Sequence, residues 1–118
     1  MDRFMNITKA LADESRVRIL MALHRQGEMC VCQLIDMLQL APSTVSKHLF
    51  ILRNARLVCS RKEGRWMHYR LNDDGAYPEV AGVLAWMTRS LAESPRIQQD
   101  DARLKAVLAD SPAEKCGG

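Results

Sequence analysis

Apolar residues recur at helical spacing over the first quarter of the chain. One run covers residues 4–11 and a second covers residues 17–23. An apolar residue at every third or fourth position predicts an amphipathic helix. Asp13 stands before the second run, where an acidic side chain is typical of a helix start, and Gly27 follows it, where glycine is typical of a helix end. The pattern therefore predicts two helices before Gly27.

Two more helices follow, separated by a proline. A short helix is predicted over residues 30–38, and it ends before Pro42 because the residue preceding a proline is pushed out of helical geometry. The next helix, over about residues 43–55, places Val45, Leu49 and Leu52 inward. Its exposed face is predicted to be mostly polar, with Ser43, Thr44, Ser46, Lys47, His48 and Arg53. A short helix, a tight turn and a polar-faced helix make a helix-turn-helix.

The hydrophobic pattern then changes period. Two β-rich runs, residues 57–62 and 66–71, flank a turn that contains Gly64, which predicts a β-hairpin with a basic tip. Helical spacing returns over residues 77–91 and, more weakly, over residues 97–108. We therefore predict a mainly α domain with a β-hairpin wing, a winged helix-turn-helix, over residues 1–110. We expect residues 111–118 to form a disordered tail.

Charge is concentrated in one part of the chain. The 118 residues carry 17 basic and 14 acidic side chains, a net charge of +3, but residues 42–70 hold seven basic side chains against Glu63 alone. Such a block over the predicted helix-turn-helix and wing is typical of a surface that binds the phosphates of nucleic acid. The charge pattern therefore favours nucleic acid as a partner, and a helix-turn-helix is suited to enter the groove of double-stranded DNA.

Other composition features exclude several classes of protein. No apolar run approaches the ~20 residues needed to cross a bilayer, and the N-terminus does not resemble a signal peptide, so we expect no membrane contact and a cytoplasmic location. No catalytic triad, paired carboxylates or glycine-rich phosphate loop supports catalysis, so we expect no enzyme. The four cysteines, in a reducing cytoplasm, are expected to be thiols or metal ligands rather than a disulfide framework.

Four ordered segments carry a resemblance to a known family. They include Ala12-Asp13-Glu14-Ser15-Arg16, then Cys30-Val31-Cys32, then Ser43-Thr44-Val45-Ser46-Lys47-His48-Leu49, then Glu63-Gly64-Arg65. In this order and spacing, over about residues 5–92, the chain resembles the ArsR/SmtB family of metal-responsive repressors, and within it the arsenical-sensing ArsR members. The resemblance implies a homodimer paired through its first and late helices, with a recognition helix in each major groove of a near-palindromic operator.

The resemblance also implies the residues that contact DNA. Carried over by position, the recognition helix would face bases or phosphates through Ser43, Thr44, Ser46, Lys47 and His48. The wing would contact the DNA backbone through Arg61, Lys62 and Arg65. Arg53 and Arg56 are equally compatible with DNA contact and with a structural role.

Cys30 and Cys32 are the candidate sensor residues. Trivalent arsenic and antimony are soft and select thiolate ligands, so these two side chains would bind the inducer and release the DNA. Residues i and i+2 of a regular helix point about 200° apart. We therefore expect ion binding to unwind the first turn of the helix over residues 30–38 and to displace the recognition helix.

The third ligand is left open by the sequence. The fuller arsenical pattern of the family has a third cysteine where this chain has Ile35. Water or another anion would complete the site, or Cys116 would reach it from the tail, or, less favoured, Cys59 would contribute. The predicted late helix has no cysteine or histidine, which disfavours the zinc site of the family's zinc sensors. The nearest alternative is a repressor on the same fold that responds to oxidation or persulfidation of Cys30 and Cys32.

Overall fold

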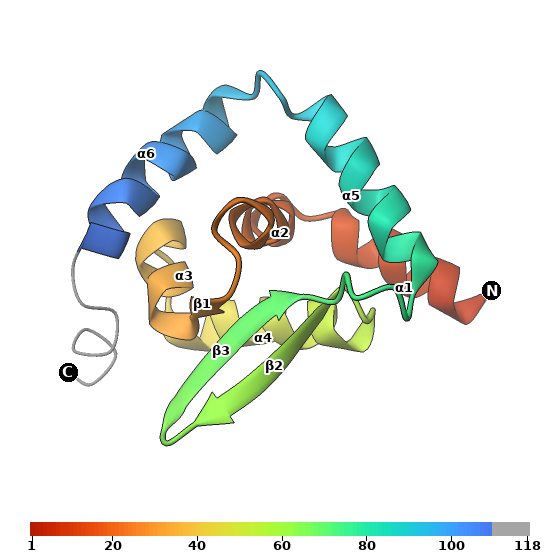
Figure 1. The fold of residues 1–118 in the computed structure, drawn as a ribbon, viewed down its shortest axis with the longest axis horizontal. Coiled ribbons are helices and arrows are strands. Elements are labelled where there is room, and N and C mark those ends of the chain that lie inside the picture. The colour runs from red at the N-terminus through yellow and green to blue at the C-terminus, as the bar shows by residue number, and fades with distance from the viewer. Residues whose placement is uncertain (110–118) are drawn as a thin grey trace.

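The computed structural model describes residues 1–109, which fold into helices packed around a small antiparallel sheet (Figure 1). The helices are α1 (Asp2–Leu11), α2 (Glu14–Gln26), α3 (Val31–Leu38), α4 (Pro42–Asn54), α5 (Pro78–Ser90) and α6 (Pro95–Ala109). The strands are β1 (Met29–Cys30), β2 (Val58–Glu63) and β3 (Trp66–Leu71). This confirms the predicted winged helix-turn-helix. The expected disordered tail, residues 111–118, and Cys116 within it lie outside the described residues.

Helix α2 forms the centre of the core. Figure 1 looks nearly along its axis, with the other helices and the sheet arranged around it. Its start is fixed by Asp13, whose side chain accepts a hydrogen bond from the backbone N–H of Arg16 at 3.2 Å. It ends at Gly27, where a positive φ of 78° suits a residue without a Cβ. Both predicted ends of this helix are therefore confirmed.

Strand β1 was not predicted from the sequence. It pairs with β3, so that Met29 lies opposite Tyr69 and Cys30 lies opposite His68, and the sheet order is β1-β3-β2. The helix was predicted to start at Cys30, but it starts one residue later, at Val31. Cys30 is extended, with φ −73° and ψ 147°, because its peptide is held in the sheet and its N–H donates to Gln33 Oε1 at 2.9 Å.

The helix-turn-helix consists of α3 and α4. Gln39 ends α3 in the left-handed conformation with φ 56°, and Pro42 begins α4, where its missing N–H breaks no helical hydrogen bond. Val45, Leu49 and Leu52 are buried beneath α4, as predicted. The core therefore fixes which face of α4 points outward.

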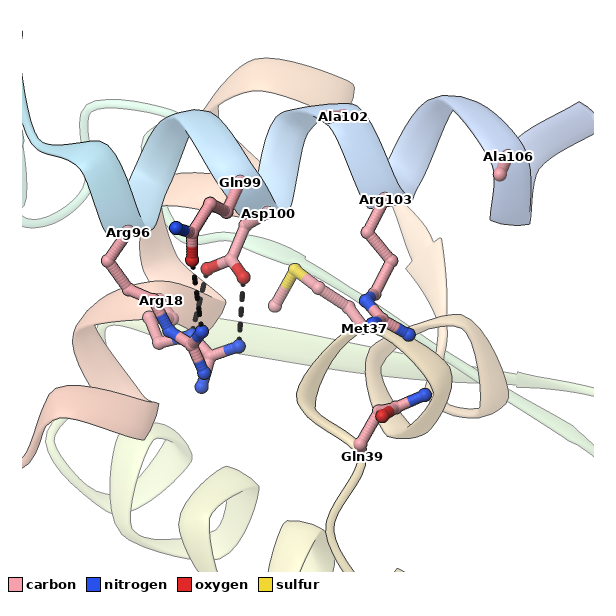
Figure 2. Close-up of a pocket in the computed structure, with 9 residues that line it drawn as sticks. All are labelled: Arg18, Met37, Gln39, Arg96, Gln99, Asp100, Ala102, Arg103 and Ala106. Atoms are coloured by element: carbon pink, nitrogen blue, oxygen red, sulfur yellow. Dashed lines mark hydrogen bonds and ion pairs between the residues drawn. The ribbon is translucent and has the colours of Figure 1, made fainter.

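Helices α5 and α6 form an arch over α2 in Figure 1, and α6 packs on both α2 and α3. Arg18 of α2 and Asp100 of α6 form a buried ion pair, with Nε–Oδ2 and Nη2–Oδ1 distances of 2.8 Å each. Figure 2 shows this pair at one side of a cavity of about 650 Å³ between α6 and the end of α3. The ion pair thus anchors α6 to α2, while α6 also packs on α3, the helix that begins next to Cys30. Within residues 1–109, none of the helices has the length and apolar character needed to cross a membrane.

Candidate DNA interface and thiol site

The outward face of α4 carries four of the five side chains through which the recognition helix was predicted to contact DNA. The exposed members of the predicted set are Ser43, Thr44, Ser46 and Lys47. Hydroxyl and ammonium groups of this kind donate hydrogen bonds to base edges and phosphates. The structure therefore brings these four residues together on one accessible helical surface.

His48 occupies a different position from the one predicted. Its side chain is only 14% exposed, and Nδ1 lies 3.3 Å from Arg16 Nη1 and 4.0 Å from Asp13 Oδ1. Arg16 also donates to the backbone oxygens of Lys9 and Ala10, at the end of α1. The expectation that His48 is exposed was wrong, because its place on α4 turns it toward the junction of α1 and α2.

The wing presents two exposed basic residues at its tip. Lys62 and Arg65 are exposed, and the Arg65 guanidinium stacks over the Trp66 ring at 5.2 Å from the centroid. Stacking keeps a guanidinium charged and accessible while it restrains the side chain. Both side chains are therefore accessible to a phosphate group at the tip of the wing.

Arg61, the third predicted wing residue, is held by two carboxylates. Its Nη2 lies 2.6 Å from Glu28 Oε1, its Nε lies 2.9 Å from Glu28 Oε2, and its Nη1 lies 2.8 Å from Glu63 Oε2. Hydrogen bonds from Arg61 lower the pKa of the Glu28 carboxyl below its ordinary value. Arg61 thus joins the wing to the residue that precedes β1, and only a rearrangement of this pair would free its donors for DNA.

Arg53 and Arg56 have structural partners. Arg53 donates to Ser60 Oγ at 3.3 Å, and Arg56 donates to the Tyr77 hydroxyl and lies over the Tyr77 ring. These contacts connect the end of α4 to β2 and to the start of α5. The sequence left open whether these two arginines contact DNA or have a structural role. The structure shows both of them with partners within the protein, as the structural role requires.

Cys30 and Cys32 bring their sulfur atoms together. The two Sγ atoms are 3.3 Å apart, Cys30 is 4% exposed and Cys32 is partly buried. The expected conflict, with side chains about 200° apart in a regular helix, does not arise because Cys30 precedes the helix in extended conformation. The prediction that the first turn must unwind to bring the two sulfurs together was therefore wrong.

The sulfur separation can be tested against ion size. If both sulfurs bond to one ion at about 2.3 Å, the thiolate distance in metal sites, the angle between the two bonds is about 90°. Tetrahedral zinc would require the sulfurs to be farther apart. Trivalent arsenic and antimony carry a lone pair and make three bonds at angles narrower than tetrahedral. A sulfur separation of 3.3 Å therefore matches bond angles of this size.

Cys59 does not approach this pair. It pairs with Arg70 on the β2 side of β3, whereas Cys30 pairs with His68 on the β1 side. Strand spacings of about 4.8 Å across and 3.4 Å along put the two Cα atoms roughly 12 Å apart. Within residues 1–109, no cluster of three or more histidine, cysteine or acidic side chains could hold a metal ion. Ile35 packs on the core, and Cys116 lies outside the described residues.

Two residues of the site were missed by sequence reasoning. Gln33 is buried at 5% exposure and accepts the Cys30 N–H, and Glu28 binds Arg61. A glutamine three residues after a helix N-cap is a known capping signal and would have pointed to Gln33. Nothing in the sequence pairs Glu28 with a residue 33 positions away.

An apolar surface extends over α1 and α5. Phe4 and Met5 of α1 are 66% and 41% exposed, and Trp86 of α5 is 58% exposed. Trp86 lines an apolar pocket with Leu11 of α1 and Leu91, which follows α5. A single chain leaves this surface open to water, which is typical of a surface that another protein covers.

Comparisons with known proteins agree with this arrangement. Residues 13–60 match the family described as bacterial regulatory protein, arsR family. The chain is 33% identical to the arsenical resistance operon repressor of Escherichia coli, over 97% of this chain and 89% of that protein. It is 40% identical to an arsenic resistance transcriptional regulator of Pseudomonas putida, over 90% of this chain and 80% of that protein.

A solved structure shares the fold as well. The reduced form of HlyU from Vibrio cholerae is 33% identical and has a TM-score of 0.63, over 75% of this chain and 87% of that one. The family match covers α2, β1, α3 and α4, the elements that carry the thiol pair and the exposed polar face. This chain therefore belongs to the ArsR family of bacterial transcriptional regulators, DNA-binding proteins that are not enzymes.

Proposed function

We propose that this protein is a cytoplasmic, homodimeric repressor that releases its operator when trivalent arsenic or antimony binds to Cys30 and Cys32. The observation that carries the proposal is the 3.3 Å separation of the two sulfurs at a largely buried place beside the wing. Soft thiolate ligands select soft ions, and such an ion binds the deprotonated sulfur of a cysteine. The names of two relatives, an arsenical resistance operon repressor and an arsenic resistance transcriptional regulator, support the choice of ion.

The sensor pair is connected to the DNA-binding elements by short paths. Cys30 lies in β1 opposite His68 of β3, and Cys32 lies in the first turn of α3, which precedes the recognition helix α4. Glu28, two residues before Cys30, binds Arg61 of the wing. An ion that draws the two sulfurs into fixed positions would therefore act on the wing and on α3 together. The DNA is released if the ion binds the DNA-free form of the protein more tightly than the DNA-bound form.

DNA binding in this proposal uses two copies of the chain. The apolar surface of α1 and α5, which includes Phe4, Met5 and Trp86, is the proposed dimer contact. Each α4 would enter a major groove, and half-sites would lie about one helical turn apart. The α4 face that includes Ser43, Thr44, Ser46 and Lys47 would read bases and phosphates, while Lys62 and Arg65 would hold the flanking backbone.

The third ion ligand is proposed to come from outside residues 1–109, within which no third histidine, cysteine or acidic side chain joins the pair in a metal-binding cluster. Cys116 of the same chain, water or another small anion can each complete a three-bond site around two protein thiolates. A Cys116→Ser variant distinguishes these sources. It would weaken the response to arsenite if Cys116 binds the ion and leave it unchanged if water or an anion does.

The test is operator binding followed by fluorescence anisotropy while arsenite is added. We expect arsenite to release DNA from the wild type but not from Cys30→Ser or Cys32→Ser, with DNA affinity retained in both variants before arsenite is added. Cys59→Ser is the matched control, since Cys59 is a free thiol away from the pair, and it should respond as the wild type does. Operator binding that ignores arsenite in the wild type would refute the arsenical assignment.

A redox-responsive repressor is the alternative function. The Sγ atoms of Cys30 and Cys32 are 3.3 Å apart, longer than a disulfide bond of about 2.0 Å, so the two sulfurs are close but not bonded to each other. A disulfide between residues i and i+2 is strained, which favours the ion over the oxidant. Release of DNA by peroxide or polysulfide but not by arsenite, lost in the same two serine variants, would support the alternative.

A further inference from the structure

Phe50 is a large apolar side chain that projects from the recognition helix into solvent. It is 57% exposed, whereas Val45, Leu49 and Leu52 of the same helix are at most 1% exposed. The hydrophobic core therefore does not account for a phenylalanine at this position.

The other large exposed apolar side chains have explanations that do not extend to Phe50. Met1, Phe4 and Met5 lie at α1, and Trp86 lies on α5, where the proposed dimer contact forms. Ile51, the neighbour of Phe50, lines a groove between α4 and α1. Phe50 is not part of that groove or of the apolar pocket at Trp86.

The helical position of Phe50 places it among the proposed base-contacting residues. At 100° per residue, Phe50 lies about 20° around the axis from Ser43, 40° from Ser46 and 60° from Lys47. It is one turn beyond Lys47, and a helical side chain leans toward the N-terminus of its helix. The phenyl ring therefore leans toward the end of α4 that enters the groove most deeply in helix-turn-helix proteins.

We propose that Phe50 contacts the C5 methyl group of a thymine in the major groove and so makes the protein select thymine at that position of each half-site. The proposal rests on the DNA-binding role of α4 given above. In the major groove the thymine methyl is the apolar feature of the base edges, and phenylalanine is one of the side chains that contact it. Serine and lysine on the same face supply hydrogen bonds and charge, which do not recognise a methyl group. An apolar side chain therefore adds selectivity for thymine that these residues cannot provide.

The test removes the methyl group alone. The wild-type protein first selects its operator from a random DNA library, and each thymine of that operator is then replaced by deoxyuridine, which keeps the base pair. We expect one symmetric pair of positions, one in each half-site, at which the methyl group matters. Loss of one methyl should weaken binding about fourfold, and loss of both about fifteenfold. These factors follow from the transfer free energy of one buried methyl group. Phe50→Ala should bind thymine and deoxyuridine operators with equal affinity.

Matched variants separate this contact from a general loss of binding. Ile51→Ala removes the neighbouring apolar side chain. It should keep the wild-type ratio of the affinities for the thymine and deoxyuridine operators. Lys47→Ala should weaken binding to both operators by the same factor and also keep the ratio. Phe50→Gln, a polar side chain of similar reach, should lose the ratio as Phe50→Ala does, and it provides the measurement if the alanine variant fails to fold.

Two results would overturn the inference, and they are distinguishable from failure of the proposed function. A specific operator whose binding ignores every thymine methyl would refute the role of Phe50 alone. A methyl preference that persists in Phe50→Ala and Phe50→Gln would refute it as well. Selection of no sequence at all would refute the repressor function, and the role of Phe50 with it.

Discussion

The ion pair between Arg18 and Asp100 is expected to contribute strongly to the stability of the fold. Both side chains are only 7% exposed, two hydrogen bonds of 2.8 Å join them, and Asp100 raises the pKa of the Arg18 guanidinium, which stays charged. Asp100→Asn leaves a buried positive charge without its counter-ion. Breaking a buried pair in this way costs roughly 3–5 kcal/mol. Arg18 lines a cavity that is large enough to hold water, so we expect the lower end, about 3 kcal/mol.

The assay is urea denaturation at one fixed protein concentration, since a dimer gains stability with concentration. Asp101→Asn is the matched control, because the neighbouring carboxylate pairs with Arg25 at the same 2.8 Å but the two side chains are 25% and 40% exposed. Exposed pairs are worth less than about 1 kcal/mol. The double variant Arg18→Met with Asp100→Leu should lose less stability than Asp100→Asn, because no buried charge is left unpaired.

The refuting result is specific. If Asp100→Asn and Asp101→Asn lose the same free energy of unfolding, burial does not govern the strength of these pairs. If the double variant is the least stable of all, the charges themselves are favourable, and the argument from desolvation is wrong.

Three further predictions concern the wing, the thiol site and the dimer. Arg61 lowers the pKa of Glu28 below 4.5, so the stabilisation from this pair is complete above pH 4.5 and disappears as the pH falls through the lowered pKa. The melting temperatures of wild type and Glu28→Gln should converge in acid, and a constant gap would contradict this. Gln33→Ala leaves the buried N–H of Cys30 without its acceptor, at a cost of about 1–3 kcal/mol. The alanine variant should need more arsenite for DNA release, whereas Gln33→Glu, which keeps an acceptor, should need a smaller increase. An unchanged midpoint of arsenite-induced release in Gln33→Ala would refute the role of Gln33 in positioning Cys30. Trp86→Lys introduces like charges at the proposed dimer contact and should give monomers in sedimentation velocity with an unchanged circular dichroism spectrum, and a persistent dimer would place the contact elsewhere.

The helices were predictable because their periodicity is local. The positions of Asp13, Gly27 and Pro42 also fixed helix boundaries correctly, since each acts through its own backbone conformation or capping group. Strand β1 was missed because two residues carry no periodicity and its partner Tyr69 lies 40 positions away. The strand decided the geometry of the thiol site, so the expected unwinding at Cys30 was wrong.

The sequence predicted which types of residue form the candidate site more completely than it predicted the contacts of these residues. Lys47 and Lys62 are exposed where the sequence placed them, because a basic side chain on a polar helical or hairpin surface has little reason to turn inward. The positions of Arg61 and His48 depend on Glu28 and Arg16, partners distant in sequence. Sequence alone gives the charge of such residues but not the carboxylate or guanidinium that folding brings to them.

The pairing of β1 with β3 makes the thiol segment a part of the wing's own sheet. In the proposed mechanism, coupling between two sites is reciprocal: an ion that weakens DNA binding by some factor is itself bound more weakly, by the same factor, when DNA is present. Operator-bound copies would then need more ion than free copies before they respond. The concentration of inducer at which transcription begins would therefore depend on how tightly the operator holds the protein, so that promoters with different operators would be induced in sequence by one sensor.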